Sequence, residues 1–403
     1  MKHSPCLAIV SPFLDKRHGT ERRVVEWISQ LAGSFEIHVY SQQVEDVDLS
    51  AITWHRIPKL PGPHLINYLW WLVANRVWRE WDRRRNLRPD LTFSPGINCL
   101  DADLISVHIV FAEYVRRNSA NLSFKQNHRS SWASLLHRRI YYSLLIWLEK
   151  RVYTRPDVLL MPIAQRIGEE LAGFYGHHER FRILYAGLDD SVFNPARRIT
   201  LRENARRQLG LTEDTFALLL IGNDWRNKGL RTLIGALAQL RGQPIHLLAA
   251  GEEEPSAFKP AIRDNGIEDR VHFLPPRRDV EFYYAAADAY AGPSLVDAFG
   301  LPFLEAMACG LPTIVSAAAG ASEIVTAGVD GLILADPADS SALAAMIRRL
   351  YEDKDLRLRL GKKAAETANQ FTWERNGREL TAAFEEILRR KSHVAERAAA
   401  QES

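Results

Sequence analysis

Short apolar runs alternate with amphipathic segments along the whole chain, and this alternation predicts strands separated by helices. In the first half, the predicted strands are 7–11, 35–40, 91–94, 104–108 and 158–161. In the second half, they are 217–222, 245–250, 271–274, 289–291, 313–316 and 331–334. After Thr20, the residues Val24, Ile28 and Leu31 recur at helical spacing, which predicts an amphipathic helix between the first two strands.

Short strands separated by helices are typical of parallel sheets that are covered on both faces. A chain of 403 residues is long enough for two such domains of about 150–200 residues each. The stretch 187–195 combines Gly, Asp, Asn and Pro between two periodic regions, which indicates a linking loop. We therefore expect an α/β fold with two doubly wound, Rossmann-like domains facing across a cleft, where a ligand binds at the carboxyl ends of the strands.

The expected domain bounds follow from that loop. An N-terminal, acceptor-binding domain spans 1–187, and a C-terminal, donor-binding domain spans 188–375. Residues 376–403 are expected to form a helix that packs back on the N-terminal domain and then a polar, Ala-rich tail with nothing obvious to pack against.

Composition favours an ordinary folded protein, with 46% hydrophobic and 25% charged residues. No apolar run approaches the roughly 18 residues that a membrane-spanning helix needs, and the start of the chain has no secretory pattern. Cys6, Cys99 and Cys309 stand far apart, which argues against a zinc site or a disulfide framework and fits a reducing compartment. We therefore expect a cytoplasmic protein.

The charge is divided unevenly. Residues 1–187 hold 25 Lys and Arg against 18 Asp and Glu, a net charge of +7, whereas the remainder holds 27 against 31, a net charge of −4. A basic N-terminal half suggests an anionic partner.

Two segments concentrate this basic character among aromatic residues. Segment 67–85 contains four Trp and five Arg, and segment 115–155 contains nine Lys and Arg with a single acidic residue, Glu149. Cations beside Trp and Tyr suit an anionic membrane surface, so we expect peripheral association with the inner face of the cell membrane. The alternative is a core face opposite a solvated basic face. Nucleic acid is not expected, because no nucleic-acid-binding motif accompanies the charge.

The most informative segment is 293–309, PSLVDAFGLPFLEAMAC. Pro302 suits the first turn of a helix, and the loop before it leaves backbone N–H groups at that helix N-terminus, an arrangement that binds a diphosphate. Gly300 permits close backbone approach. Asp297 precedes the loop and Glu305 follows about one turn into the helix, so one carboxylate can hold a sugar and the other a ribose. An acidic pair alone would carry little weight, because solvated carboxylates are common.

The whole string is far more specific and resembles the retaining glycosyltransferases of family 4, which have the two-domain GT-B fold. The segment 221–229, IGNDWRNKG, resembles the loop in which the family places a lysine, here Lys228, and a nearby arginine, here Arg226, against the donor diphosphate. The resemblance also implies donor contacts in two further places. Those residues are Arg278 and Val280 beside the base, and Phe299, Gly300 and Leu301 at the diphosphate loop.

Within that family the sequence looks most like the lipopolysaccharide core glucosyltransferases that add glucose to heptose. The shared features are the strings at 223–229 and 278–280, and the segment 109–114 followed by a long basic, aromatic insertion. The resemblance covers most of the chain and is weaker in the N-terminal half. It implies a UDP-sugar donor, with UDP-glucose as the candidate in that subgroup, and a lipopolysaccharide-like acceptor.

In the N-terminal half, Gly19 falls where the family has a Gly-Gly pair before a helix, with His18 in place of the first Gly. The resemblance implies that Gly19 lets the backbone approach the donor. His108 ends a predicted strand, where many family members have a histidine near the reaction centre. A lone histidine on an apolar strand is more often a core residue, so His108 is a candidate catalytic residue on the strength of the resemblance.

We expect no catalytic metal and no cofactor besides the nucleotide-sugar substrate. Asp101-Ala102-Asp103 matches a metal motif of a different glycosyltransferase fold, but its place before a strand favours turn chemistry. The first acidic position of the family string is usually Glu and is Asp297 here, so its carboxylate reaches about one methylene less far.

The sequence thus predicts a retaining, metal-independent hexosyltransferase with His108, Asp297 and Lys228 as catalytic residues. The expected acceptor is a cell-envelope glycan or a lipid-linked sugar. Two alternatives stay open. One is a binding protein that kept the donor pocket and lost transfer, which the departures at Asp297 and His18 motivate. The other is a nucleotide-sugar 2-epimerase, which shares the architecture but lacks the acidic-pair string.

Overall fold

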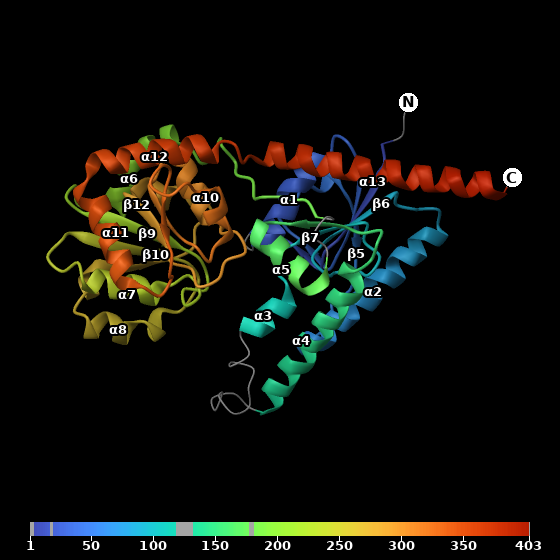
Figure 1. Ribbon diagram of the computed structural model, residues 1–403, viewed down its shortest axis with the longest axis horizontal. Coiled ribbons are helices and arrows are strands. Elements are labelled where there is room, and N and C mark those ends of the chain that lie inside the picture. The colour runs from blue at the N-terminus through green and yellow to red at the C-terminus, as the bar shows by residue number, and fades with distance from the viewer. Residues whose placement is uncertain (1–3, 17–18, 118–131, 177–180, 403) are drawn as a thin grey trace. The chain divides into compact units, whose positions relative to one another are not determined.

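The computed structural model describes residues 4–16, 19–117, 132–176 and 181–402. Contacts divide the chain into two compact units, and the colours of Figure 1 follow the chain through both. Unit 1 comprises Met1–Tyr185 and Trp373–Ser403, and unit 2 comprises Ala186–Thr372. The bounds expected from sequence, after 187 and after 375, lie two and three residues later than these.

Unit 1 contains a parallel sheet with the strand order β5-β3-β1-β6-β7-β8. Its strands are β1 (Cys6–Val10), β3 (Glu36–Ser41), β5 (Thr53–Arg56), β6 (Leu91–Pro95), β7 (Leu104–Val107) and β8 (Leu159–Pro162). A separate short pair joins β2 (Phe13–Leu14) to β4 (Gln43–Val44). The pairing of Leu7 with both Ile37 and Leu91 places β1 in the interior of the sheet, which explains why its sequence is almost wholly apolar.

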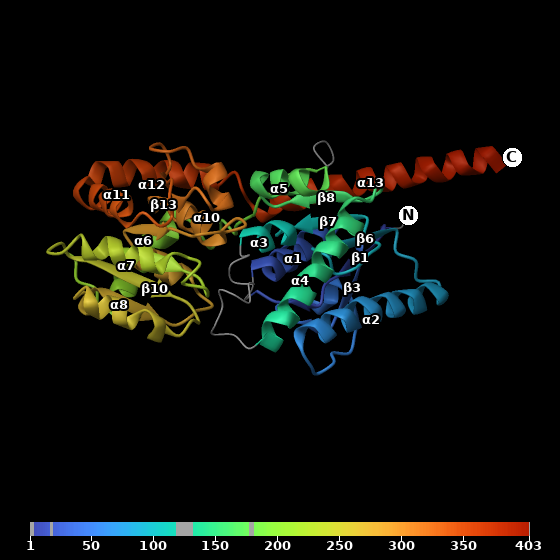
Figure 2. The same ribbon diagram turned by 60° about the horizontal axis from the view of Figure 1, so that its bottom comes forward.

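Helices cover both faces of this sheet. The helices of unit 1 are α1 (Gly19–Leu31), α2 (His64–Arg84), α3 (Phe111–Arg117), α4 (Trp132–Tyr153), α5 (Gln165–Tyr175) and α13 (Trp373–Glu402). On one face, Phe93 of β6 contacts Trp27 of α1 and Phe384 of α13 edge to face. On the other, residues of β1 and β7 share one core cluster with residues of α2, α4 and α5, and Figure 2 shows α2 and α4 beside the sheet.

Helix α13 packs on α1 and continues through the polar, Ala-rich segment that was expected to form a tail. It runs without a break to Glu402, and in both views its last turns extend past the rest of unit 1. The tail is rich in Ala, Glu and Arg, which have high intrinsic helix propensity, so the helix continues beyond its last packed residues.

Unit 2 contains a second parallel sheet with the strand order β11-β10-β9-β12-β13-β14. Its strands are β9 (Phe216–Ile221), β10 (Ile245–Ala250), β11 (Val271–Leu274), β12 (Ala289–Gly292), β13 (Thr313–Ser316) and β14 (Leu332–Leu334). Its helices are α6 (Pro195–Gln208), α7 (Leu230–Ala238), α8 (Lys259–Asp264), α9 (Glu281–Ala286), α10 (Leu301–Ala308), α11 (Ser340–Glu352) and α12 (Lys354–Ala368). None of the helices in the described ranges is long and apolar enough to cross a membrane.

The core of unit 2 lies mainly between the sheet and the helices α7, α8 and α11. Leu218, Leu247 and Ile314 from three strands meet Leu233 of α7 and Ile347 of α11 in this cluster, all of them at most 2% exposed. The expected α/β fold with two Rossmann-like domains is confirmed in both units.

Each sheet reverses its direction of growth at one place. In unit 1 the reversal lies between β1 and β6, and in unit 2 it lies between β9 and β12. At such a switch point the loops after the two strands turn to opposite faces of the sheet and leave a crevice where ligands bind. The loops that follow β9 and β12 carry the two strings singled out in the sequence, 222–229 and 293–300.

Candidate functional site

The loop after β9 is shaped by two glycines and one lysine. Gly222 has φ +154°, and a Cβ there would lie 2.9 Å from Cε of Lys228, so the lysine side chain lies directly over this glycine. Gly229 has φ +80°, and a Cβ there would lie only 2.0 Å from the carbonyl oxygen of Pro293. The absence of both side chains therefore lets Lys228 fold back over its own loop and lets that loop touch the end of β12.

Lys228 reaches the first acidic residue of the second loop. Its Nζ lies 2.5 Å from Oδ2 of Asp297, and the two side chains are 18% and 12% exposed. A partly buried ion pair of this kind gains more from its Coulomb attraction than a surface pair, because water screens it less. The sequence treated the two residues as separate ligand contacts, whereas the structure joins them.

The main chain of the loop 293–300 is held on both sides by hydrogen bonds. Leu295 donates its N–H to the carbonyl of Asn227 at 2.7 Å, and the side-chain amide of Asn227 donates to the carbonyl of Val296 at 2.7 Å. On the other side, Gly320 donates to the carbonyl of Asp297 at 3.1 Å. Asn227 is a site residue that the sequence did not single out, since its role depends on a loop almost 70 positions away.

Helix α10 begins directly beside this ion pair. Gly300 precedes it with φ +92°, and a Cβ there would lie 2.6 Å from the Phe303 ring and 3.1 Å from Oδ2 of Asp297. Pro302 stands in the first turn, as predicted. Phe299 is 1% exposed, and Ala321 donates to its carbonyl at 2.8 Å, so this residue anchors the loop. The helix N-terminus, with its positive dipole end, thus lies next to Asp297.

Glu305 lies inside α10 and is 3% exposed. Its Oε2 accepts a hydrogen bond from the hydroxyl of Tyr284 on α9 at 2.7 Å. Burial, with the nearby Glu305 carboxylate, raises the pKa of Tyr284 well above its ordinary value, so the hydroxyl remains a donor. Tyr284 was missed by sequence reasoning, and nothing local to its position marks it as a partner of Glu305.

The remaining predicted donor residues of unit 2 lie at or near its surface. Arg226 and Arg278 are exposed, and Leu301 and Val280 are partly buried at the starts of α10 and α9. The side chain of the neighbouring Arg277 is fixed by two contacts. It donates to both carboxylate oxygens of Asp279 at 2.7 and 3.0 Å, and its guanidinium lies 4.0 Å from the Phe282 ring centroid. The Arg-x-Asp spacing is the local signal that could have identified that pair.

In unit 1, His108 follows β7 and is held by two hydroxyl groups. Its Nδ1 lies 3.3 Å from Oγ1 of Thr20, and its Nε2 lies 3.1 Å from Oγ of Ser106. Burial, assisted by the positive charge of Arg23, lowers the pKa of His108 well below 6.5, so the ring is neutral at neutral pH.

Gly19 is the first residue of α1 and is exposed. A Cβ at this position would meet no other atom within 4 Å. His18 lies outside the described residues. The structure brings Lys228, Asp297 and Gly300 together within unit 2, and it brings Thr20 to His108 within unit 1. A single site that joins His108 to Lys228 would span both units and stays a prediction.

Asp101 and Asp103 hold the fold of unit 1. Asp101 accepts hydrogen bonds from Arg79 at 2.6 and 2.9 Å. Asp103 accepts from the N–H of Thr92 at 2.8 Å and pairs with Lys391 of α13 at 2.8 Å. Within the described ranges, no group of three or more His, Cys, Asp or Glu side chains is arranged to hold a metal ion.

Both loops, 222–229 and 293–300, lie in a part of the chain that is similar to a known family. Residues 202–367 match the family described as glycosyl transferases group 1. Among curated proteins, the chain is 31% identical over 252 residues to a D-inositol 3-phosphate glycosyltransferase of Corynebacterium urealyticum, a match that covers 59% of each chain. A protein of the same name from Salinispora tropica is 31% identical over 256 residues, 60% of this chain and 53% of that protein. The chain therefore spans less than two thirds of the length of the curated relatives it matches.

Solved structures match over nearly the whole chain. WaaG, a glycosyltransferase involved in lipopolysaccharide biosynthesis, aligns with a TM-score of 0.76 and 21% identity, over 93% of this chain and 98% of that one. Anabaena HepE in complex with UDP and glucose aligns with a TM-score of 0.70 and 20% identity, over 95% of this chain and 100% of that one. At these identities the likeness concerns the fold. Residues 202–367 are thus similar to group 1 glycosyl transferases, in a chain that has the GT-B fold.

Proposed function

We propose that the protein is a retaining, metal-independent glycosyltransferase that moves a hexose from a UDP-sugar to a cell-envelope glycan or lipid-linked acceptor, such as lipopolysaccharide core. The observation that carries this proposal is the contact of Lys228 with Asp297 beside the N-terminus of α10, at the switch point of the unit 2 sheet. A cation, a helix N-terminus and a carboxylate lie together there, and groups of this kind can bind a diphosphate and a sugar.

The proposed chemistry follows from those groups. An incoming donor places its diphosphate between Lys228 and the start of α10, and Arg226 adds a second positive charge. As the bond from the sugar C1 to the diphosphate oxygen breaks, negative charge builds on the diphosphate, and these fixed positive groups stabilise it. The acceptor hydroxyl oxygen forms the new bond to C1 on the same face, and its proton passes to the departing diphosphate. Asp297 holds the sugar, and Glu305 holds the ribose.

The donor and acceptor classes rest on similarity. HepE was crystallised with UDP and glucose, which supports a UDP-sugar. The curated relatives are named for D-inositol 3-phosphate, so a phosphorylated cyclitol belongs in the acceptor panel beside envelope glycans. The lipopolysaccharide acceptor is supported by the likeness to WaaG and by the sequence resemblance.

The deciding experiment is proton NMR of the protein with UDP-, GDP- and ADP-sugars. Slow hydrolysis of one donor to the α-sugar would identify the donor and support retention. Lys228→Ala should reduce that hydrolysis, and transfer to an acceptor, by about 10²–10³-fold, since one charge-stabilising donor is lost. Lys259→Ala, an exposed lysine on α8, is the matched control and should behave as wild type. Equal turnover of both variants would remove Lys228 from the site.

The same spectra separate the alternatives. A 2-epimerase would produce the epimeric nucleotide sugar from donor alone. A binding protein without transfer would hold the donor and show neither hydrolysis nor transfer to any acceptor, including a membrane extract.

We further propose that the protein is cytoplasmic and that unit 1 binds the anionic inner face of the cell membrane through 67–85 and 115–155. Residues 118–131 of the second segment, with Phe124, lie outside the described residues. In the described part, α2 exposes Val73, Val77 and Trp81 along one stripe, at 59%, 54% and 50%. The guanidinium of Arg85 lies 3.6 Å from the Trp81 ring centroid, so a cation accompanies this apolar stripe.

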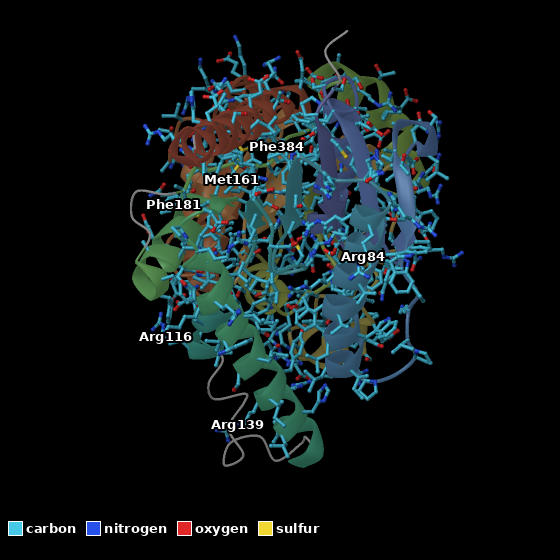
Figure 3. The ribbon with its side chains drawn as sticks, turned by 90° about the vertical axis from the view of Figure 1, so that its right-hand side faces the viewer. Arg84, Arg116, Arg139, Met161, Phe181 and Phe384 are labelled. Carbon is cyan, nitrogen blue, oxygen red and sulfur yellow. The ribbon has the colours of Figure 1, made fainter. Side chains whose placement is uncertain are left out.

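Arg84 of α2 and Arg139 of α4 are exposed and bring positive charge to the same two segments (Figure 3). The double variant Arg84→Glu, Arg139→Glu should bind liposomes containing anionic lipid several-fold more weakly in a sedimentation assay, because it removes cations that attract the headgroups. The control Lys259→Glu, Arg348→Glu makes the same charge change on exposed residues of unit 2 and should bind like wild type. Wild-type binding that is equal on neutral and anionic liposomes, or unaffected by salt, would contradict the proposal.

A further inference from the structure

Glu149 of α4 is a fully buried carboxylate that holds the start of α3. Its Oε1 accepts the N–H of Phe111 at 2.6 Å, and its Oε2 accepts the N–H of Ala112 at 3.0 Å. Its Oε2 also accepts the hydroxyl of Tyr175 on α5 at 2.8 Å. One side chain thereby links three helices, and all of the donors that it meets favour its ionised form.

The clamped backbone is the segment that carries His108. Strand β7 ends at Val107, and the two clamped N–H groups belong to residues three and four positions after His108. On the strand side, Val107 accepts the N–H of Ile163 at 3.1 Å. Val110, between His108 and the clamp, is fully buried. Residues 108–112, here called the His108 strap, are therefore fixed at one end by the sheet and at the other end by Glu149.

Near neutral pH, the Glu149 carboxyl is present in both its ionised and its protonated form. Burial raises the pKa of Glu149 to about 7, in spite of the three hydrogen bonds that lower it. The ionisable groups that face it are Glu170, which also raises the pKa, and Tyr175 on α5, Tyr153 on α4 and Tyr68 on α2. A protonated carboxyl would present an O–H among groups that are themselves donors, so protonation costs the clamp at least one of its hydrogen bonds.

We propose that Glu149 is a positioning residue for sugar transfer: its ionised carboxylate fixes the His108 strap, and so sets where the His108 imidazole stands. This inference rests on the proposed function, with His108 at the reaction centre. A displacement of about 1 Å at a reacting group can cost about 10²-fold in rate. Loss of the clamp therefore slows transfer without touching the donor loops of unit 2.

The test compares Glu149→Gln with wild type across pH 5.5 to 8.5, roughly the range that brackets the carboxyl pKa of about 7. Glutamine keeps the size and lacks the charge, so it resembles the protonated state. At high pH, kcat should be about 10- to 100-fold below wild type, with UDP affinity unchanged. At low pH the ratio of the wild-type kcat to the variant kcat should approach one, because Glu149 of the wild type is then protonated too. Glu169→Gln, an exposed carboxylate on α5, is the control and should follow wild type throughout.

The proposal would be overturned if the ratio of the wild-type kcat to the Glu149→Gln kcat did not change with pH. Full activity of Glu149→Gln at high pH would overturn it as well. If that variant does not fold, Tyr175→Phe serves instead. It removes one donor from the carboxylate, so the acid limb of the pH profile should shift upward, and an unmoved limb would overturn the proposal.

The NMR signal of the His108 imidazole supplies a readout that needs no turnover. In wild type it should shift near the pKa of Glu149, and in Glu149→Gln this step should vanish, since His108 itself titrates well below 6.5. A wild-type protein that transfers no sugar would count against the proposed function, and the His108 signal would still decide whether the clamp operates.

Discussion

Gly300 determines the geometry of the loop 293–300 at the scale of one residue. Its φ of +92° is a conformation that side chains disfavour, and a Cβ there would also press on Phe303 and approach Asp297. The loop can therefore turn into α10 beside the ion pair only because the side chain is missing.

Gly300→Ala is expected to lower the stability of unit 2 and to weaken donor binding. The left-handed backbone alone costs about 1–2 kcal/mol. Gly328→Ala is the matched control: its φ is +78°, but a Cβ there would meet nothing within 4 Å, so this variant carries the backbone strain without the clash. Thermal unfolding and calorimetric titration with UDP-sugar should show a larger loss for Gly300→Ala. Equal losses in both assays would show that the contacts with Phe303 and Asp297 are unimportant.

Helix α13 illustrates how one element depends on a few buried contacts. Phe384 is fully buried and meets the rings of Phe35 and Phe93 edge to face, at centroid distances of 5.5 and 6.0 Å. Figure 3 shows it between α13 and the rest of unit 1. Farther along the same helix, Val394 is 68% exposed. The first part of α13 is therefore an integral part of the unit 1 core.

Phe384→Ala should destabilise unit 1 by about 3–5 kcal/mol, because it removes buried ring surface and leaves a cavity. Val394→Ala on the same helix should change stability by less than about 0.5 kcal/mol. Urea unfolding followed by tryptophan fluorescence would measure both. An unfolding transition of Phe384→Ala that coincides with that of Val394→Ala would contradict the packing described for α13.

At the scale of the whole molecule, histidines with lowered pKa values occur in both units. His246 and His272 lie with Nδ1 and Nε2 2.9 Å apart, and burial is the first cause of the lowered pKa of each. The pKa of His108 in unit 1 is lowered well below 6.5, again by burial. In each case the unfolded chain takes up a proton at a higher pH than the folded protein does.

Stability should therefore fall as the pH drops below about 6.5, the pH at which these side chains titrate in the unfolded chain, because the unfolded state then binds more protons. Glu149 acts in the opposite direction: its raised pKa favours the folded state below about 4.5 and loses that contribution as the pH rises through about 7. The melting temperature of Glu149→Gln should accordingly decline more steeply on acidification than that of wild type. A steeper decline in wild type would show that the carboxyl is ionised more readily than its burial implies.

The sequence by itself determined the kind of fold and the place of the loops 222–229 and 293–300. Strands β10, β11 and β13 have the predicted bounds, and the family string at 293–309 begins a helix at Leu301 after Gly300. These features are local, because apolar runs, Gly and Pro act on their own neighbourhood. The sequence missed the edge strand β5, Thr53–Arg56, whose side chains are half-buried or exposed and therefore show no apolar run.

Only the tertiary structure decided which distant residues meet. Lys228 contacts Asp297, Tyr284 donates to Glu305, and Glu149 caps the segment after His108 across separations that no spacing rule reports. Those contacts follow from strand order and from the faces to which the helices are assigned. Glu149 appeared in the sequence only as the single acid of a basic segment. Its burial beside two free N–H groups depends on the packing of α3, α4 and α5, because a carboxylate becomes a clamp only where the fold supplies its donors.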